Sequence, residues 1–425
     1  MALSTITSIA SRGINLLISI ISVPLLLNYL GAERYGMYAM VTSIQGFMMF
    51  SDFGLGLGLQ NRIPEFQQHE DKTVLHKAIS STFFTLAAIV LLLFLLLTFS
   101  IRFADWAHFY NVSTPLASNE ASPISWAFFI CFFVGLPFNV AFYLLTGSQQ
   151  AYKTEIWRTL GNLLSLLLLL LFTYLKVGTP FLIYSAYGSI SLATIAAFIF
   201  VFNTTDKNLL PNIKLWNYEM VKNISIDGSK YFILQIFAIG LTTVDSFFIA
   251  HYQSTESVSI FMIGFRIVSI ITLPLVLINS QFLPSLNDAI VKNDFVWIKK
   301  SIKNLLRINS IYVVIVSIIL FFTGDFLLKI WLKNTIYFDT KLWLGFICLF
   351  IFSAFNWLLS CVFLTPSLVK FNLKIFPIAV IAIVLVKFFA IQYFSIGEML
   401  MLSLLTYSIF FFMPALIKLK KSNFY

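Results

Sequence analysis

The chain has 425 residues, of which 59% are hydrophobic and only 11% are charged. Soluble domains carry about 25% charged residues, so the composition excludes a soluble protein and requires lipid as the solvent. The formal net charge of +10 comes from basic residues scattered through short loops, which argues against a nucleic-acid-binding surface.

Twelve apolar runs are long enough to cross a bilayer, which takes roughly 20 residues per helix. We therefore predict an all-α polytopic membrane protein with two six-helix lobes, 1–202 and 229–425, the second ending in a short basic tail. A polar and amphipathic connector, 203–228, joins the lobes. In chain order the predicted spans are 4–30, 36–60, 78–101, 124–146, 157–175, 180–202, 229–251, 257–284, 307–323, 341–364, 375–395 and 398–417.

The first predicted span carries a polar stripe along its whole length. Its polar residues fall within an arc of about 100° on a helix. They are Ser4, Ser8, Ser11, Arg12, Asn15, Ser19 and Ser22. Such a stripe either packs its small residues against a neighbouring helix or lines a hydrated cavity. Arg12 and Asn15 favour the cavity, with Ser8, Asn15 and Ser19 as lining residues.

The stretch "SDFGLGLGLQNR", 51–62, ends the second predicted span. Gly54 and Gly58 form a small-xxx-small pair that lets another helix approach closely, and with Gly56 they make this end of the helix easy to bend. Asp52 is either a structural residue or a charged gate at the inner mouth of a cavity.

Four ionisable residues lie inside predicted spans, namely Asp52, Asp245, Arg266 and Lys387. Such residues usually face the interior of a helix bundle and mark functional sites. Asp245 and Arg266 lie at similar depths on consecutive predicted helices, which permits an ion pair of structural or functional meaning. Lys387 is too deep to reach water easily, and its alternative role is to partner a polar side chain such as Gln392 or Asn356.

Basic residues are distributed unevenly between alternate loops. With the N-terminus in the cytoplasm, twenty Lys and Arg residues fall on the cytoplasmic side and six on the other side. Because cytoplasmic loops of membrane proteins are enriched in Lys and Arg, we expect both termini in the cytoplasm. No loop leaves room for a soluble catalytic domain, so an enzyme is not expected.

The two halves of the chain resemble each other faintly. "LLTGSQQAYK" at 144–153 pairs with "FLTPSLVKFN" at 363–372, and 28–40 pairs with 251–263 at a similar offset. In both pairings, a predicted helix of the first half corresponds to the helix six places later in the chain. They predict two parallel repeats around a central cavity, an arrangement in which transporters hold a substrate and alternate access by rocking.

Three segments resemble a known family. "YLGAERYGMYAMVTSIQGFMMFSDFGLGLGLQNRI", 29–63, resembles the first hairpin of the Wzx-type O-antigen flippases, through its "LG-E-YG-Y" turn and its "S-D-F-G-L-G" stretch. "TTVDSFFIAHY", 242–252, resembles the family's seventh helix, and "GSQQAYK", 147–153, resembles its loop after helix four. This family belongs to the superfamily that includes the multidrug and toxin extruders and the lipid II flippase.

The resemblance implies a flippase that moves undecaprenyl-pyrophosphate-linked O-antigen, or another polysaccharide repeat unit, across the bacterial inner membrane from the cytoplasmic to the periplasmic leaflet. Arg12, Arg266 and Lys387 would contact the pyrophosphate, since guanidinium and ammonium groups suit phosphate oxygens. Asp52 and Asp245 would serve ion coupling or gating. H⁺ or Na⁺ is the expected coupling ion, no other cofactor or metal is expected, and the O-antigen polymerase and chain-length regulator are expected partners.

Two alternatives stay open. A multidrug or small-cation exporter of the same fold would need an acidic cavity, whereas the deep charges here include Arg266 and Lys387. An O-antigen polymerase usually carries a large outer loop with catalytic acidic or Arg residues. The best outer loop of this chain, 102–123, offers only Arg102, Asp105, His108 and Glu120.

Overall fold

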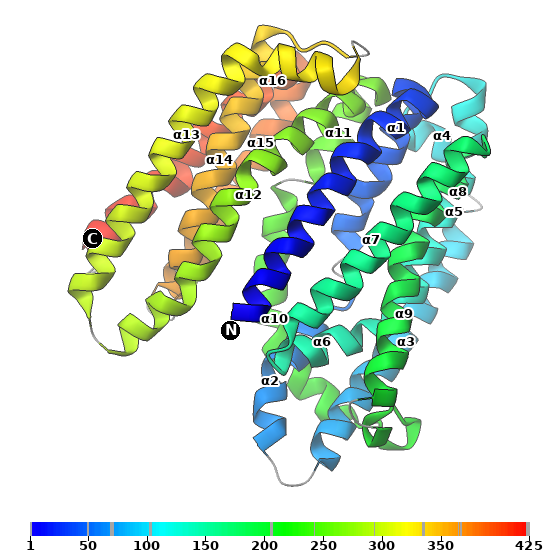
Figure 1. The fold of residues 1–425 in the computed structure, drawn as a ribbon, viewed down its shortest axis with the longest axis vertical. Helices are drawn as coiled ribbons and strands as arrows, with labels where there is room; N and C mark the ends of the chain where they lie inside the picture. Colours follow the sequence, from blue (N-terminus) through cyan, green and yellow to red (C-terminus); the bar gives the residue numbers. More distant parts are fainter. Residues whose placement is uncertain are drawn as a thin grey trace. The chain divides into compact units, whose positions relative to one another are not determined.

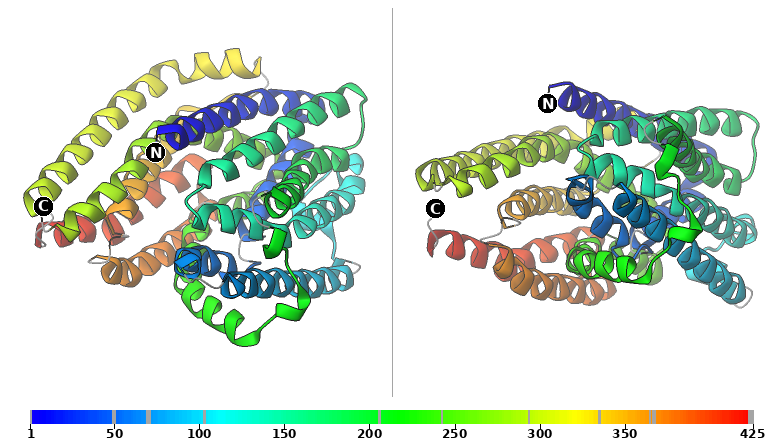
Figure 2. Two further views of the ribbon diagram at one scale, coloured as in Figure 1. Left: turned by 60° about the horizontal axis from the view of Figure 1, so that its bottom comes forward. Right: turned by 90° about the horizontal axis from the view of Figure 1, so that it is seen from below.

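The computed structural model describes residues 2–48, 51–68, 72–101, 104–204, 207–241, 243–292, 294–333, 336–363, 365 and 368–421. Every regular element within these residues is a helix, as Figure 1 shows. The chain forms two compact units, Met1–Ile236 and Phe237–Tyr425, and the first unit ends inside a helix. Figure 2 gives two further views of the same helices. The predicted all-α class is confirmed.

The first unit is built from long α-helices and several short helical turns. They are α1 (Ala2–Met48), α2 (Leu55–Gln68), α3 (Thr73–Ile101), α4 (Trp106–Tyr110), α5 (Pro115–Gly135), η1 (Pro137–Asn139), α6 (Val140–Gly147), α7 (Ala151–Tyr174), α8 (Thr179–Ile183), η2 (Tyr184–Gly188), α9 (Ser189–Thr204), η3 (Lys207–Leu209), η4 (Ile213–Leu215) and most of α10 (Tyr218–Gly240).

The second unit begins with the end of α10. Its further helices are α11 (Val244–Tyr252), α12 (Thr255–Val291), α13 (Phe295–Leu332), α14 (Thr340–Phe363), α15 (Val369–Tyr393), α16 (Ile396–Tyr407), η5 (Ser408–Phe412) and α17 (Met413–Lys421).

Ten helical segments of the described residues are long and apolar enough to cross a bilayer, so the protein is a multi-pass membrane protein. The first of them, Ala10–Ile44, carries parts of two predicted spans, because α1 runs through both and only Gly31 departs from helical geometry, with φ of +74°. The predicted span 229–251 is divided between α10 and α11. The count of twelve spans stays a prediction.

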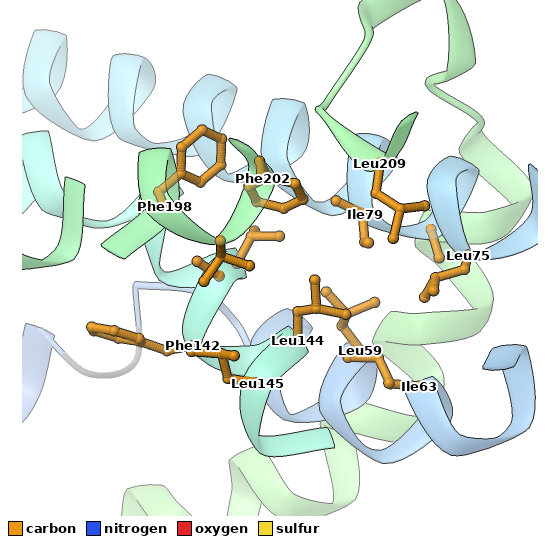
Figure 3. Packing of buried hydrophobic residues seen from close by; sticks show 14 of the residues in the cluster. Leu59, Ile63, Leu75, Ile79, Phe142, Leu144, Leu145, Phe198, Phe202 and Leu209 are labelled. Carbon is orange, nitrogen blue, oxygen red and sulfur yellow. The ribbon is translucent and has the colours of Figure 1, made fainter. Parts of the chain in front are cut away.

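A cluster of buried apolar residues fixes α2 within the first unit. In Figure 3, side chains from α2, α3, α6 and α9 point toward one another. The labelled members are Leu59, Ile63, Leu75, Ile79, Phe142, Leu144, Leu145, Phe198, Phe202 and Leu209. Because lipid is as apolar as these side chains, close packing rather than exclusion of water holds helices together where they meet in a membrane.

The "LGAERYG" residues that identify the first hairpin form a clasp between helices. Arg34 donates two parallel hydrogen bonds to Glu120 on α5, at 2.8 and 2.9 Å, and its Nη2 donates a third to Thr179 Oγ1 at the start of α8, at 2.8 Å. The neighbouring Glu33 accepts a hydrogen bond from the backbone amide of Thr114 at 3.1 Å. We call Arg34, Glu120 and Thr179 the α1 clasp.

Replacing Arg34 by Lys is expected to lower the free energy of unfolding by about 2 kcal/mol, because a charged hydrogen bond contributes roughly 1.5–3 kcal/mol and Lys cannot donate the parallel pair. Thermal unfolding of the purified protein in detergent measures the effect. Arg307→Lys, at an exposed position on α13, is the matched control and should leave the melting temperature unchanged. Equal melting temperatures of the two variants would contradict a stabilising role for the clasp.

Candidate functional site

Asp52 lies in a turn between α1 and α2 and caps the second of these helices. Its carboxylate accepts hydrogen bonds from the backbone amides of Gly54, at 2.9 Å, and Gly56, at 3.2 Å. The hydroxyl of Tyr143 donates to the same carboxylate at 3.1 Å. The predicted helix 36–60 is therefore interrupted, and Asp52 sits at the positive end of the new helix, where a carboxylate is stabilised. A gating or coupling role for Asp52 stays a prediction, and it would require this turn to open.

Gly56 and Gly58, and Gly228 on α10, each have a separate structural reason. A Cβ on Gly56 would lie 2.0 Å from the ring of Tyr143, so this glycine makes room for the side chain that reaches Asp52. A Cβ on Gly58 would lie 2.2 Å from the carbonyl oxygen of Ile224 on α10, and a Cβ on Gly228 would lie 2.1 Å from the carbonyl oxygen of Gly54. The small-xxx-small interpretation of Gly54 and Gly58 is thus confirmed: the backbones of α2 and α10 touch.

Two further contacts surround this α2/α10 crossing. Arg62 Nε lies 2.6 Å from Asp227 Oδ2, and both side chains are about one-third exposed. The rings of Phe53 and Phe232 lie 6.0 Å apart. An ion pair with this exposure contributes little to stability, so the backbone contact and not the charge pair determines how closely the two helices approach.

The polar stripe of α1 faces α7 where the structure describes its side chains. Asn162 donates a hydrogen bond to Asn15 Oδ1 at 3.0 Å, and Asn15 Nδ2 lies 3.5 Å from Thr159 Oγ1. Ser19 Oγ is buried and has no hydrogen-bond partner among the described residues. The side chain of Ser8 lies outside the described residues. Asn15 therefore packs helix against helix, and a cavity-lining role for the stripe stays a prediction.

Asp245 and Lys387 form a buried ion pair between α11 and α15. Lys387 Nζ lies 2.8 Å from Asp245 Oδ1 and donates a hydrogen bond to Oδ2 at 2.9 Å. It donates a further hydrogen bond of 2.6 Å to the carbonyl oxygen of Leu241, in the break between α10 and α11. The side chain of Asp245 is 1% exposed and that of Lys387 is 2% exposed. One ammonium group thus neutralises a carboxylate and satisfies a carbonyl group that lies beyond the end of α10.

This pairing corrects two interpretations of the sequence. The proposed partner of Asp245 was Arg266, which instead lies exposed on α12, and the proposed partners of Lys387 were Gln392 and Asn356. Depth counted along two consecutive helices cannot identify a partner on a helix that follows about 140 residues later in the chain. The break at Leu241 also makes the depth count along a continuous 229–251 helix wrong.

The three cations predicted to contact pyrophosphate have different surroundings. Lys387 is neutralised by Asp245, whereas Arg12 and Arg266 have no ion-pair partner among the described residues. Arg12 is half-buried on α1, and Arg266 lies in the apolar segment Thr255–Asn279. A cavity of about 270 Å³ in the first unit lies elsewhere, between α2, α3 and α6, and none of the predicted site residues lines it.

Several residues in these contacts could not be found from the sequence. Tyr143, Asn162 and Asp227 carry no signal of their own, because their roles depend on contacts between distant segments. Gly228 is different, since a glycine in the "IDGSK" stretch of a predicted connector is compatible with a close helix contact.

The family of this chain and its fold are shared with known proteins. Residues 2–289 match the family described as polysaccharide biosynthesis protein. The chain belongs to this family. A protein of Yersinia pseudotuberculosis that is named as an O-antigen export protein is 22% identical over 331 residues, which are 75% of this chain and 72% of the relative.

Solved structures of transporters share the fold of this polysaccharide biosynthesis family member. An inward-facing multidrug resistance MATE family transporter of the MOP superfamily superimposes with a TM-score of 0.79 at 13% identity, over 97% of this chain and 98% of that one. The lipid II flippase MurJ in an inward closed conformation gives 0.72 at 15% identity, over 99% and 88%. These similar proteins are transporters by name, which agrees with the expectation of a transporter rather than an enzyme.

Proposed function

We propose that this protein is a flippase for polyprenyl-pyrophosphate-linked oligosaccharides, O-antigen or other surface polysaccharide repeat units, in the bacterial inner membrane. The family match and the relative named as an O-antigen export protein support this substrate class. The excess of basic residues in alternate loops supports cytoplasmic termini. Transport toward the periplasmic leaflet is part of the proposal and follows from the substrate class.

The observation that carries this proposal is the presence of two arginines without ion-pair partners, among the described residues, in apolar helices. A pyrophosphate and a glycan that cross roughly 30 Å of hydrocarbon need polar groups to replace water. The guanidinium groups of Arg12 and Arg266 can each donate two hydrogen bonds to phosphate oxygens. In the proposed mechanism such arginines bind the head group while the protein alternates access between the two sides of the membrane, and the polyprenyl tail stays in lipid.

The buried pair is our candidate for ion coupling. A proton or a sodium ion at Asp245 would compete with the ammonium group of Lys387 for the same carboxylate oxygens. Release of Lys387 would then provide a third cation for the pyrophosphate. Asp52 is the second candidate, because opening of its turn would free a carboxylate that now caps α2.

The multidrug exporter remains the second candidate function, because the MATE family transporter shares this fold over nearly the whole chain. Such an exporter of small cations would need accessible carboxylates inside its helices. Asp245 is neutralised by Lys387 and Asp52 accepts three hydrogen bonds, whereas two arginines lack an ion-pair partner among the described residues. The charge balance therefore favours an anionic substrate.

Deletion of the gene in its bacterium tests the proposal. We expect loss of surface polymer and accumulation of single lipid-linked repeat units that face the cytoplasm, as measured by their accessibility in right-side-out and inverted vesicles. Accumulation on the periplasmic face would point instead to a polymerase. Unchanged surface polymer combined with new drug sensitivity would support the multidrug exporter.

Replacing Arg266 by Ala is expected to reduce polymer export at least tenfold, because removing a charged hydrogen-bond donor to phosphate costs about 1.5–3 kcal/mol. Quantification of surface polymer at matched membrane protein levels measures the effect. Lys329→Ala removes an exposed cation near the end of α13 and serves as the control, with export unchanged. If both variants export normally, Arg266 does not hold the head group.

A further inference from the structure

The start of α13 carries an exposed basic stripe. At 100° per residue, Lys299, Lys300, Lys303 and Arg307 fall within an arc of about 100°, and all four side chains are exposed. The opposite side of the same turns is buried and is formed by Ile298, Ile302, Leu305 and Asn309. The first turns of α13 therefore pack against the rest of the second unit through one face and present the four cations, together with the exposed Val296, on the other.

The length of α13 places this basic stripe beside the membrane surface. The helix has 38 residues and is about 57 Å long, nearly twice the thickness of the hydrocarbon core. After three exposed apolar residues in its first turn, Phe295, Val296 and Trp297, the exposed apolar side chains of α13 resume at Ile308 and continue to Ile330, a distance of about 33 Å that matches this core. The four cations precede Ile308 within about 14 Å, so their long side chains reach the head-group region.

The end of α17 adds two cations at the same end of the second unit. Leu419 is buried and lines one apolar crevice together with Ile302 and Leu305, which places the last turn of α17 beside the buried side of α13. Lys418 and Lys420, on either side of Leu419, are exposed. Six exposed cations thus lie at one end of the second unit.

The first turn of α13 adds an interfacial anchor beside the stripe. Trp297 is 37% exposed and stacks on Phe282, with ring centroids 5.9 Å apart, and tryptophan is typical of membrane–water interfaces. The one acidic residue between positions 294 and 307 is Asp294, whose carboxylate is engaged by the backbone amide of Trp297 as the cap of α13.

We propose that the basic stripe of α13 binds the phosphate groups of anionic phospholipids. Four to eight basic residues next to a membrane-spanning helix attract anionic lipid head groups by roughly 1 kcal/mol each, which is about fivefold in affinity per charge. The assignment of these lipids to the cytoplasmic leaflet rests on the orientation in the proposed function. Lipid binding would fix the depth and tilt of α13 without being part of the substrate path.

Native mass spectrometry of the full chain in detergent tests the proposal with dioleoylphosphatidylglycerol and dioleoylphosphatidylcholine as probes. We expect preferential retention of phosphatidylglycerol and at least a tenfold loss of its affinity in the triple variant Lys299→Gln, Lys300→Gln, Lys303→Gln. The control is Lys207→Gln, Lys214→Gln, Lys222→Gln, which removes three exposed cations that do not share one helix face and should retain the affinity. A triple Lys→Arg variant of the stripe should also retain it, which separates loss of charge from loss of structure.

Equal phosphatidylglycerol affinity in the stripe variant and the control would overturn the proposal. So would displacement of the phospholipid by an equal concentration of farnesyl pyrophosphate, which would assign the stripe to the substrate head group. Because binding is measured in detergent, its failure leaves the flippase proposal intact, and failure of the deletion experiment leaves the lipid-binding result intact.

Discussion

Lys387→Met is expected to lower the free energy of unfolding by about 3–5 kcal/mol, the usual cost of leaving one member of a buried ion pair without its partner. The variant leaves the Asp245 carboxylate 1% exposed and removes the donor to the Leu241 carbonyl. Thermal unfolding in detergent and protein level in membranes measure the effect. An unchanged melting temperature would show that the pair is not formed in the folded protein.

The double variant Lys387→Met, Asp245→Leu separates stability from coupling. Replacement of a buried ion pair by apolar residues of similar volume is often neutral or stabilising, so the melting temperature should recover relative to Lys387→Met alone. Export should stay defective if Asp245 binds the coupling ion. Full export by a stable double variant would leave the pair with a structural role only.

Gly228→Ala is expected to destabilise the protein by about 3 kcal/mol or more, at the upper end of the cost of overpacking, because the new Cβ would lie 2.1 Å from the backbone oxygen of Gly54. Backbone atoms cannot rotate away, so α2 and α10 must separate. Gly56→Ala meets the ring of Tyr143, a side chain that can move, and a smaller loss is expected.

The control for this series is Gly13→Ala, because nothing lies within 4 Å of a Cβ at Gly13. A glycine in a helix interior is about 1 kcal/mol less favourable than alanine, so this variant should be unchanged or slightly more stable. Melting temperatures in detergent should rank Gly13→Ala above Gly56→Ala and Gly56→Ala above Gly228→Ala. If Gly228→Ala and Gly13→Ala have the same melting temperature, the backbones at Gly228 and Gly54 are not in contact.

The fold class could be predicted from the sequence, and so could the close approach of another helix to Gly54 and Gly58. Both depend on patterns that can be read within one short segment, namely hydropathy and the spacing of small residues. In the sequence, "LGAERYG" indicates only a family, because the contacts of its residues are made with distant segments. Arg34 holds α5 and α8 to α1, and Gly31 supplies the left-handed residue between the two halves of α1.

The interruptions near Asp52 and Leu241 lie within long apolar runs, and hydropathy averages across such breaks, so the sequence predicted two continuous spans and, at the first break, only a helix end that bends easily. A local signal existed at the first of them, since Asp two residues before a glycine is typical of a capped turn. The Asp245–Lys387 pair had no local signal. Its members are 142 positions apart, so only the packing of α11 against α15 brings them together.

The contact between the backbones of α2 and α10 also limits how these helices can move. Helices whose side chains interlock over many turns resist both sliding and rotation. Here the backbones touch at Gly54, Gly58 and Gly228, so the helices can rotate about this contact without moving one row of side chains past another. The crossing therefore has the geometry of a pivot. A small rotation of α10 there would be enlarged with distance along the helix from Gly228.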